Sequence, residues 1–132
     1  MTIVGRVHAG GEAVVPLRVR GPRGASAEFQ TLVDTGFNDW LTLPAEAINA
    51  LALPFREEGR YTLADGSQAL TRLFTAEAEW LGERRRILVV EMDADPLLGM
   101  GMLRGCYLGV EVMEGGRVEI QPLAERRTQN GE

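Results

Sequence analysis

The chain has 132 residues, 45% of them hydrophobic, with a formal net charge of -5 and one cysteine, Cys106. This length is enough for one hydrophobic core but not for two lobes, and the negative charge argues against a nucleic-acid partner because phosphate binding needs a concentrated basic face. A single cysteine excludes an intrachain disulfide and fits a reducing compartment. No apolar run has the length of a signal peptide or a membrane span, so we expect a cytoplasmic protein with no membrane partner.

The first half of the chain is predicted to be mostly β, because short runs of strand-forming residues alternate with Gly, Pro and Asp. The strands expected there end at turn residues and cover 2–8, 13–19, 28–33 and 40–43. Pro44 and the alanines that follow it predict a short helix over 45–51.

The second half continues the same pattern. Asp65-Gly66 predicts a hairpin turn between two extended runs. The strands expected in this half cover 61–63, 69–78, 85–91, 107–113 and 117–121. A helical turn is expected over 100–104. Together these elements predict an all-β domain over 1–122 with one or two short helices, followed by a frayed polar tail over 123–132.

Leu32-Val33-Asp34-Thr35-Gly36 is the segment that indicates chemistry. A carboxylate that activates water must be held at a fixed point, half-buried, beside hydrogen-bond donors. Leu32 and Val33 favour a buried strand leading to it, and Gly36 permits a sharp turn. Taken alone, Asp-Thr-Gly is also an ordinary turn at the end of a strand. Since the chain has one copy, a second catalytic carboxylate would have to come from another subunit.

Several features in order along the chain resemble the retropepsin-like aspartic peptidases, the single-lobe clan that includes the retroviral proteases. They are the apolar lead-in to Asp34, the short helix, the hairpin at Asp65-Gly66, and a second apolar unit, Leu97-Leu98-Gly99, before a helical turn. Asp34-Thr35-Gly36-Phe37 followed by Leu41-Thr42-Leu43-Pro44 resembles the microbial branch. The fold that this resemblance implies is a single-lobe closed barrel of the acid-protease type.

The resemblance also implies roles for particular residues. Asp34 would be the catalytic carboxylate, and the Thr35 hydroxyl would tie two active-site loops together across a homodimer. The residues implied to support the active-site loop are Thr35, Gly36, Leu97, Leu98 and Gly99. The residues implied to bind a peptide or protein substrate are Gly36, Phe37, Asn38 and Asp39, with Asp65 and Gly66 in a flap.

Two departures from the retroviral pattern bear on the dimer and the flap. Met100 stands where retroviral enzymes usually carry an Arg that helps to order the dimer, and the flap has fewer glycines. The residues that could form either the dimer interface or the core are Val110, Val112 and Ile120. Candidate walls of the substrate groove are Phe37, Trp40 and Tyr61, although aromatic residues at strand positions are more often in the core.

The chemistry that such a dimer implies is the hydrolysis of peptide bonds by an endopeptidase. Two carboxyl groups about 3 Å apart cannot both ionise, so they share one proton, as is established for aspartic proteases in general. One group then acts as a base toward water and the other as an acid. The expected pH profile is acid-shifted, with two apparent values that belong to the pair. No metal or cofactor is implied.

Other chemistries have weaker support. His8 is the single histidine, and no motif beside it favours nucleophilic catalysis. Cys106 is expected to be a small apolar residue in the interior. The acidic residues Glu91, Asp93 and Asp95 resemble a solvated turn, and the basic run at 84–86 a solvated turn before the next strand. The alternative function is a peptide-binding or dimerisation module on the same fold.

Overall fold

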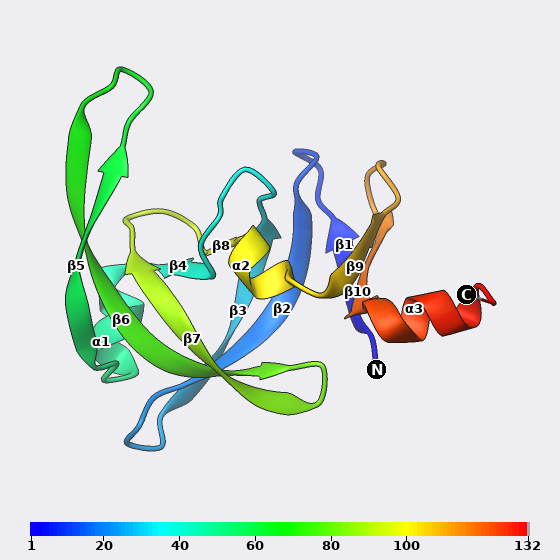
Figure 1. Ribbon diagram of the computed structural model, residues 1–132, viewed down its shortest axis with the longest axis horizontal. Coiled ribbons are helices and arrows are strands. Elements are labelled where there is room, and N and C mark those ends of the chain that lie inside the picture. Colours follow the sequence, from blue (N-terminus) through cyan, green and yellow to red (C-terminus); the bar gives the residue numbers. More distant parts are fainter. Residues whose placement is uncertain (132) are drawn as a thin grey trace.

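Residues 1–131, which the computed structural model describes, form ten strands and three short helices (Figure 1). The strands are β1 Ile3–Val7, β2 Ala13–Arg20, β3 Ser26–Val33, β4 Leu41–Leu43, β5 Phe55–Thr62, β6 Gln68–Trp80, β7 Glu83–Glu91, β8 Leu97–Leu98, β9 Cys106–Val110 and β10 Arg117–Pro122. The helices are α1 Ala45–Ala50, α2 Met100–Leu103 and α3 Leu123–Gln129. Within the described part of the chain, no helix combines the length and hydrophobicity that a membrane crossing requires.

The strands close into a barrel. Their order in the sheet is β5-β6-β7-β4-β8-β3-β2-β1-β10-β9, and β2 pairs a second time with β6, through Val19 opposite Ala78 and Arg20 opposite Glu77. The run from β6 to β2 therefore returns on itself, while β5 lies outside the ring and β1, β10 and β9 extend it beyond β2. The predicted single-lobe, mostly β closed barrel is confirmed.

Parallel pairing places the two apolar units side by side. β3 runs parallel to β8, with Leu32 opposite Leu97 and Val33 opposite Leu98. On its other side β8 meets β4, which itself runs parallel to β7. As a result, the ends of β3 and β8 lie next to each other, and the loops that follow Val33 and Leu98 start from neighbouring points.

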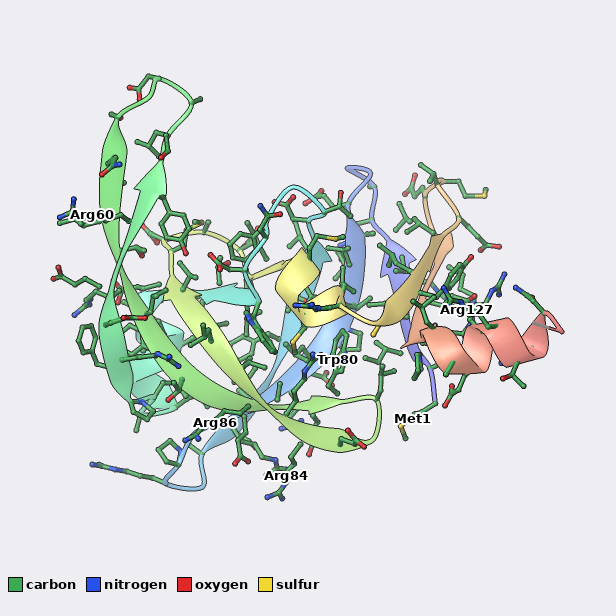
Figure 2. The ribbon with its side chains drawn as sticks, in the orientation of Figure 1. Met1, Arg60, Trp80, Arg84, Arg86 and Arg127 are labelled. Carbon is green, nitrogen blue, oxygen red and sulfur yellow. The ribbon has the colours of Figure 1, made fainter. Side chains whose placement is uncertain are left out.

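The core fills the barrel with side chains from alternate strand positions. On β2, Val15, Leu17 and Val19 are buried at 0–1% exposure while the residues between them are partly exposed. Trp80, which Figure 2 shows among the strands, is 5% exposed. Each large apolar side chain buried in this way contributes about 1.5–3 kcal/mol. The core fixes the strands, and through them the two loops.

The β5–β6 hairpin is longer than the sequence suggested. The first strand was predicted to start at Tyr61, but β5 starts at Phe55 and pairs with β6 through Thr62 opposite Gln68. Six of the eight β5 residues are exposed and four are charged, so the strand lacks the regular alternation of apolar and polar residues that would predict it. Residues 55–62 become a strand because they pair with the long strand β6. In Figure 1 the hairpin rises beyond the barrel, and we call it the flap.

The C-terminal segment differs from its prediction. Residues after 122 were expected to fray, but Leu123–Gln129 form helix α3. The guanidinium carbon of Arg126 lies 4.3 Å from the centre of the Tyr107 ring, and the Leu123 amide donates to the Gly105 carbonyl at 3.0 Å. Contacts with Tyr107 on β9 and with Gly105 just before that strand thus hold α3 in place. The helix has no buried residue, so the sequence carries no apolar periodicity that would predict it.

Candidate active site

Asp34 follows β3 directly and starts the loop of residues 34–40, which we call the active-site loop after the role that the sequence predicts for it. Its amide donates to the Leu98 carbonyl at 2.9 Å, and its carboxylate oxygen Oδ1 accepts the Gly36 amide at 2.9 Å. The Phe37 amide then donates to the Asp34 carbonyl at 3.1 Å. This is an Asx turn, in which an Asp side chain caps the backbone two residues further on. Asp34 is half-buried, whereas Thr35 and Gly36 are exposed.

The segment that follows β8 holds this loop through backbone hydrogen bonds. The Met100 amide donates to the Phe37 carbonyl at 2.7 Å, the Gly99 amide to the Trp40 carbonyl at 3.0 Å, and the Gly101 amide to the Asp39 carbonyl at 3.1 Å. Leu98 is fully buried and Leu97 half-buried. The structure thus brings Leu97-Leu98-Gly99 beside Asp34-Thr35-Gly36.

Gly99 is a point of close backbone approach. A Cβ atom there would lie 2.2 Å from the Asp39 carbonyl oxygen and 2.5 Å from Cδ2 of Phe37. The Gly99 φ of -101° is open to any residue, so space rather than backbone conformation requires glycine. Phe37, predicted to contact substrate, is half-buried with its ring against Gly99, whereas Asn38 is exposed.

Thr42 supports the Leu97-Leu98-Gly99 segment, a role that the sequence analysis did not assign to it. It lies on β4, is fully buried, and its hydroxyl oxygen accepts the Leu97 amide at 2.8 Å. A buried polar side chain is costly unless it is hydrogen-bonded, so this contact explains a threonine between two leucines. The signal in the sequence was a polar residue between two leucines of a predicted strand, which could have indicated a buried hydroxyl that needs a hydrogen-bond partner.

Arg85 is a second such residue, and it corrects the prediction for the basic run. Residues 84–86 lie in β7 rather than in a turn. Figure 2 shows Arg84 and Arg86 directed away from the barrel. Arg85 instead places its guanidinium 4.8 Å from the Trp40 ring centre and donates to the Met102 carbonyl at 3.0 Å. It therefore joins the end of the active-site loop to α2.

Arg85→Ala should lower the free energy of unfolding by about 2 kcal/mol, because it removes a cation–π contact and leaves a carbonyl without its charged donor. Urea denaturation followed by circular dichroism measures this. The exposed neighbour provides the control, since Arg84→Ala should change stability by less than about 0.5 kcal/mol. Equal losses in the two variants would contradict the contacts assigned to Arg85.

Asp65 and Gly66 form the flap turn, as predicted. The Asp65 oxygen Oδ1 accepts the Ser67 amide at 2.9 Å and the Ser67 hydroxyl at 2.5 Å. The two hydrogen bonds from Ser67 lower the pKa of Asp65. Gly66 has a φ of +84°, a conformation that favours glycine. Both residues are exposed at the tip, and it is Tyr61, further down β5, that contacts the active-site loop through Asp39.

The remaining candidate groups lie elsewhere. His8 is exposed in the turn after β1. Cys106 is half-buried against the core, and burial raises the pKa of its thiol, which favours a packing role over a nucleophilic one. Among residues 1–131, no three His, Cys, Asp or Glu side chains gather as a metal site would require.

Three concave surfaces of the molecule lie away from Asp34. Three concavities have volumes of about 470, 370 and 400 Å³, and none of the three is lined by Asp34. Arg20, Arg84 and Arg86 line the first of them. In one chain the active-site loop therefore stands at the surface rather than inside one of these concavities.

Comparison with solved structures gives a match over nearly the whole chain. A retropepsin-like aspartic protease from Rickettsia conorii superposes with a TM-score of 0.56 at 18% sequence identity, covering 92% of this chain and 92% of that chain. No family model matches this chain. No curated protein matches it either. The chain therefore shares the fold of the retropepsin-like aspartic proteases.

Proposed function

We propose that this protein is an aspartic endopeptidase that is active as a homodimer, with Asp34 of each subunit in one shared site. The observation that carries the proposal is the geometry of the active-site loop in a retropepsin-like barrel. Asp34 is half-buried, capped by the Gly36 amide and anchored to Leu98, so its carboxylate is held in place yet remains reachable. The single chain supplies one such carboxylate, and a second copy supplies the other.

In the proposed dimer the two carboxyl groups share one proton and hold a water molecule between them. The ionised group takes a proton from the water, whose oxygen attacks the carbonyl carbon of the scissile peptide bond. The protonated group donates to the carbonyl oxygen and gives a tetrahedral diol. Proton transfer to the amide nitrogen then breaks the C–N bond and releases a carboxylic acid and an amine. The proposed chemistry uses no metal or cofactor.

The tip of the β9–β10 hairpin is a candidate dimer contact. Val112 and Met113 are 85% and 66% exposed, and Val110 is 37% exposed. Ile120, which the sequence could not assign, is fully buried and belongs to the core. In Figure 1 this tip lies along the same upper edge of the molecule as the loop between β3 and β4. A partner that approaches Asp34 from this side would also cover the tip.

Val112→Asp should weaken dimerisation at least about 10-fold, because it places an unpaired charge in an interface expected to bury about 1,200–2,000 Å² in total. Sedimentation equilibrium over a range of concentrations measures the dissociation constant. Val112→Ile keeps the apolar surface and should leave that constant unchanged. If Val112→Asp associates as strongly as the wild type, the contact lies elsewhere.

The function is tested by incubating the protein with a diverse peptide library at acidic and neutral pH, beside Asp34→Asn. Cleavage by the wild type alone, stronger in acid, is the expected result. Substrates should be extended peptides with apolar residues around the cut, because a two-fold groove receives them symmetrically. If neither protein cleaves but both bind the same peptides, the peptide-binding module replaces the enzyme.

A further inference from the structure

The flap is fastened to the rest of the molecule on both of its strands. On β6, the Thr71 hydroxyl donates to the Glu91 carbonyl at 2.8 Å, and Arg72 forms an ion pair with the Glu91 carboxylate at 2.7 Å. On β5, the Tyr61 hydroxyl donates to Oδ2 of Asp39 at 2.6 Å. Beyond these contacts, the turn residues 63–67 are all exposed. Tyr61 therefore marks the boundary between the held base of the flap and its free tip.

The contact on β5 has the character of a strong hydrogen bond. A hydroxyl that donates to a carboxylate at 2.5–2.7 Å is charge-assisted and about twice as strong as a neutral pair. Both Tyr61 and Asp39 are half-buried, so water competes less for the carboxylate than it would at the surface. The bond joins residues 22 positions apart, one on the flap and one on the active-site loop.

Asp39 is also fixed from its other side. Its carbonyl accepts the Gly101 amide at 3.1 Å, which ties the residue to the start of α2. The Asp39 side chain therefore connects the flap to the rigid part of the site, in which Asp34 is anchored to Leu98. If the flap moves away from the active-site loop, the hydrogen bond between Tyr61 and Asp39 must break or the loop must move with the flap.

We propose that Tyr61 is a positioning residue that latches the flap to the active-site loop and occupies the Asp39 carboxylate, leaving Asn38 to bind the substrate main chain. This inference rests on the proposed peptidase function and refines its substrate site. The resemblance assigned substrate binding to both Asn38 and Asp39. In the structure Asn38 is exposed, whereas Asp39 already accepts a hydrogen bond from its own chain.

The Tyr61 hydroxyl keeps its proton throughout the acidic and neutral range. Burial, followed by the hydrogen bond and the charge of Asp39, raises the pKa of Tyr61 above its ordinary value of 10.0. A raised pKa means that the stabilisation by the neutral phenol is complete below the ordinary value and is lost only as pH rises through the higher folded-state value. The phenol therefore stays a donor at every pH at which an aspartic peptidase would work.

Hydrogen exchange of backbone amides tests the latch without requiring activity. Tyr61→Phe keeps the ring and removes the hydroxyl, and it should speed exchange at flap residues 60–71 about 10-fold, the factor expected for losing one hydrogen bond to a charged group. Exchange in β2 and β3 should not change. Tyr107→Phe, which removes the other tyrosine hydroxyl, should leave the flap as it is. An unchanged flap, or acceleration spread over the whole barrel, in Tyr61→Phe would overturn the latch.

Variants of Asp39 give the reciprocal test and cover the case in which Tyr61→Phe does not fold. Asp39→Ala should speed flap exchange as Tyr61→Phe does, and Asp39→Asn should do so less because its amide oxygen still accepts the hydroxyl. The double variant Tyr61→Phe with Asp39→Ala should exchange no faster than either single variant. Additive effects would show that the two side chains act separately.

Kinetics separate positioning from general stability. With a cleaved peptide, Tyr61→Phe should raise KM several-fold and leave kcat within about two-fold, because the hydroxyl acts on flap position and not on the carboxyl pair. A large loss of kcat with an unchanged KM would contradict the assignment. The hydrogen-exchange test can also be made in the Asp34→Asn background, where Tyr61→Phe should speed flap exchange by the same factor. Absence of peptidase activity would therefore refute the proposed function but leave the Tyr61 latch to be decided by exchange.

Discussion

Asp34→Asn is expected to abolish peptide cleavage while leaving the fold intact. An asparagine cannot take a proton from water, and loss of a general base or acid typically lowers the rate by about 10²–10⁴-fold. The side-chain carbonyl of the asparagine can still accept the Gly36 amide, so the Asx turn should survive. The ratio kcat/KM measures the first effect, and thermal unfolding measures the second.

Asp65→Asn is the matched control. Asp65 has a similar capping role in the flap turn, where its carboxylate accepts the Ser67 amide and hydroxyl. Because it lies at the exposed tip, its replacement should reduce kcat/KM far less than the change at Asp34. Cleavage that persists in Asp34→Asn at a comparable rate would rule out Asp34 as the catalytic carboxylate.

Gly99→Ala should be the most destabilising single-methyl change in the loops around Asp34. The new Cβ would lie 2.2 Å from the Asp39 carbonyl oxygen and 2.6 Å from the Phe37 carbonyl oxygen. Both atoms belong to the backbone and accept hydrogen bonds from Gly101 and Met100, so they cannot move without loss. Overpacking of this kind costs about 3 kcal/mol, which should lower Tm by about 10 °C.

Gly59→Ala provides the comparison for this substitution. A Cβ at Gly59 on β5 would meet Leu73 and Thr71 side-chain atoms at 3.3–3.6 Å, which a leucine can relieve by a small rotation. Differential scanning calorimetry of the two variants should therefore show a large fall in Tm for Gly99→Ala and a small one for Gly59→Ala. Similar values would mean that the active-site loop tolerates displacement, contrary to the rigid support described above.

Local patterns predicted the parts of the fold that depend on neighbouring residues. The strand that leads into Asp34, the turn at Asp65-Gly66 and the short helix α1 follow from strand propensity, turn chemistry and the proline start. The position of Leu97-Leu98-Gly99 beside Asp34 came from the resemblance, and the parallel pairing of β3 with β8 confirms it. Their roles in catalysis and substrate binding remain proposals.

The missed features depend on contacts between distant residues. Thr42 accepts a hydrogen bond from a residue 55 positions away, and Tyr61 donates to one 22 positions away. No periodicity encodes such pairs. The same reason explains α3, whose polar residues form a helix through Arg126 on Tyr107, and the start of β5, where pairing with β6 outweighs an unfavourable charged sequence.

The shared site is tested most directly by mixing wild-type and Asp34→Asn subunits in varying proportions at a fixed total concentration, under conditions in which subunits exchange. If two Asp34 carboxylates form one site, mixed dimers are inactive and total activity follows the square of the wild-type fraction. Activity that instead declines in simple proportion to that fraction would show that each subunit hydrolyses peptides by itself, and the proposed mechanism would be wrong.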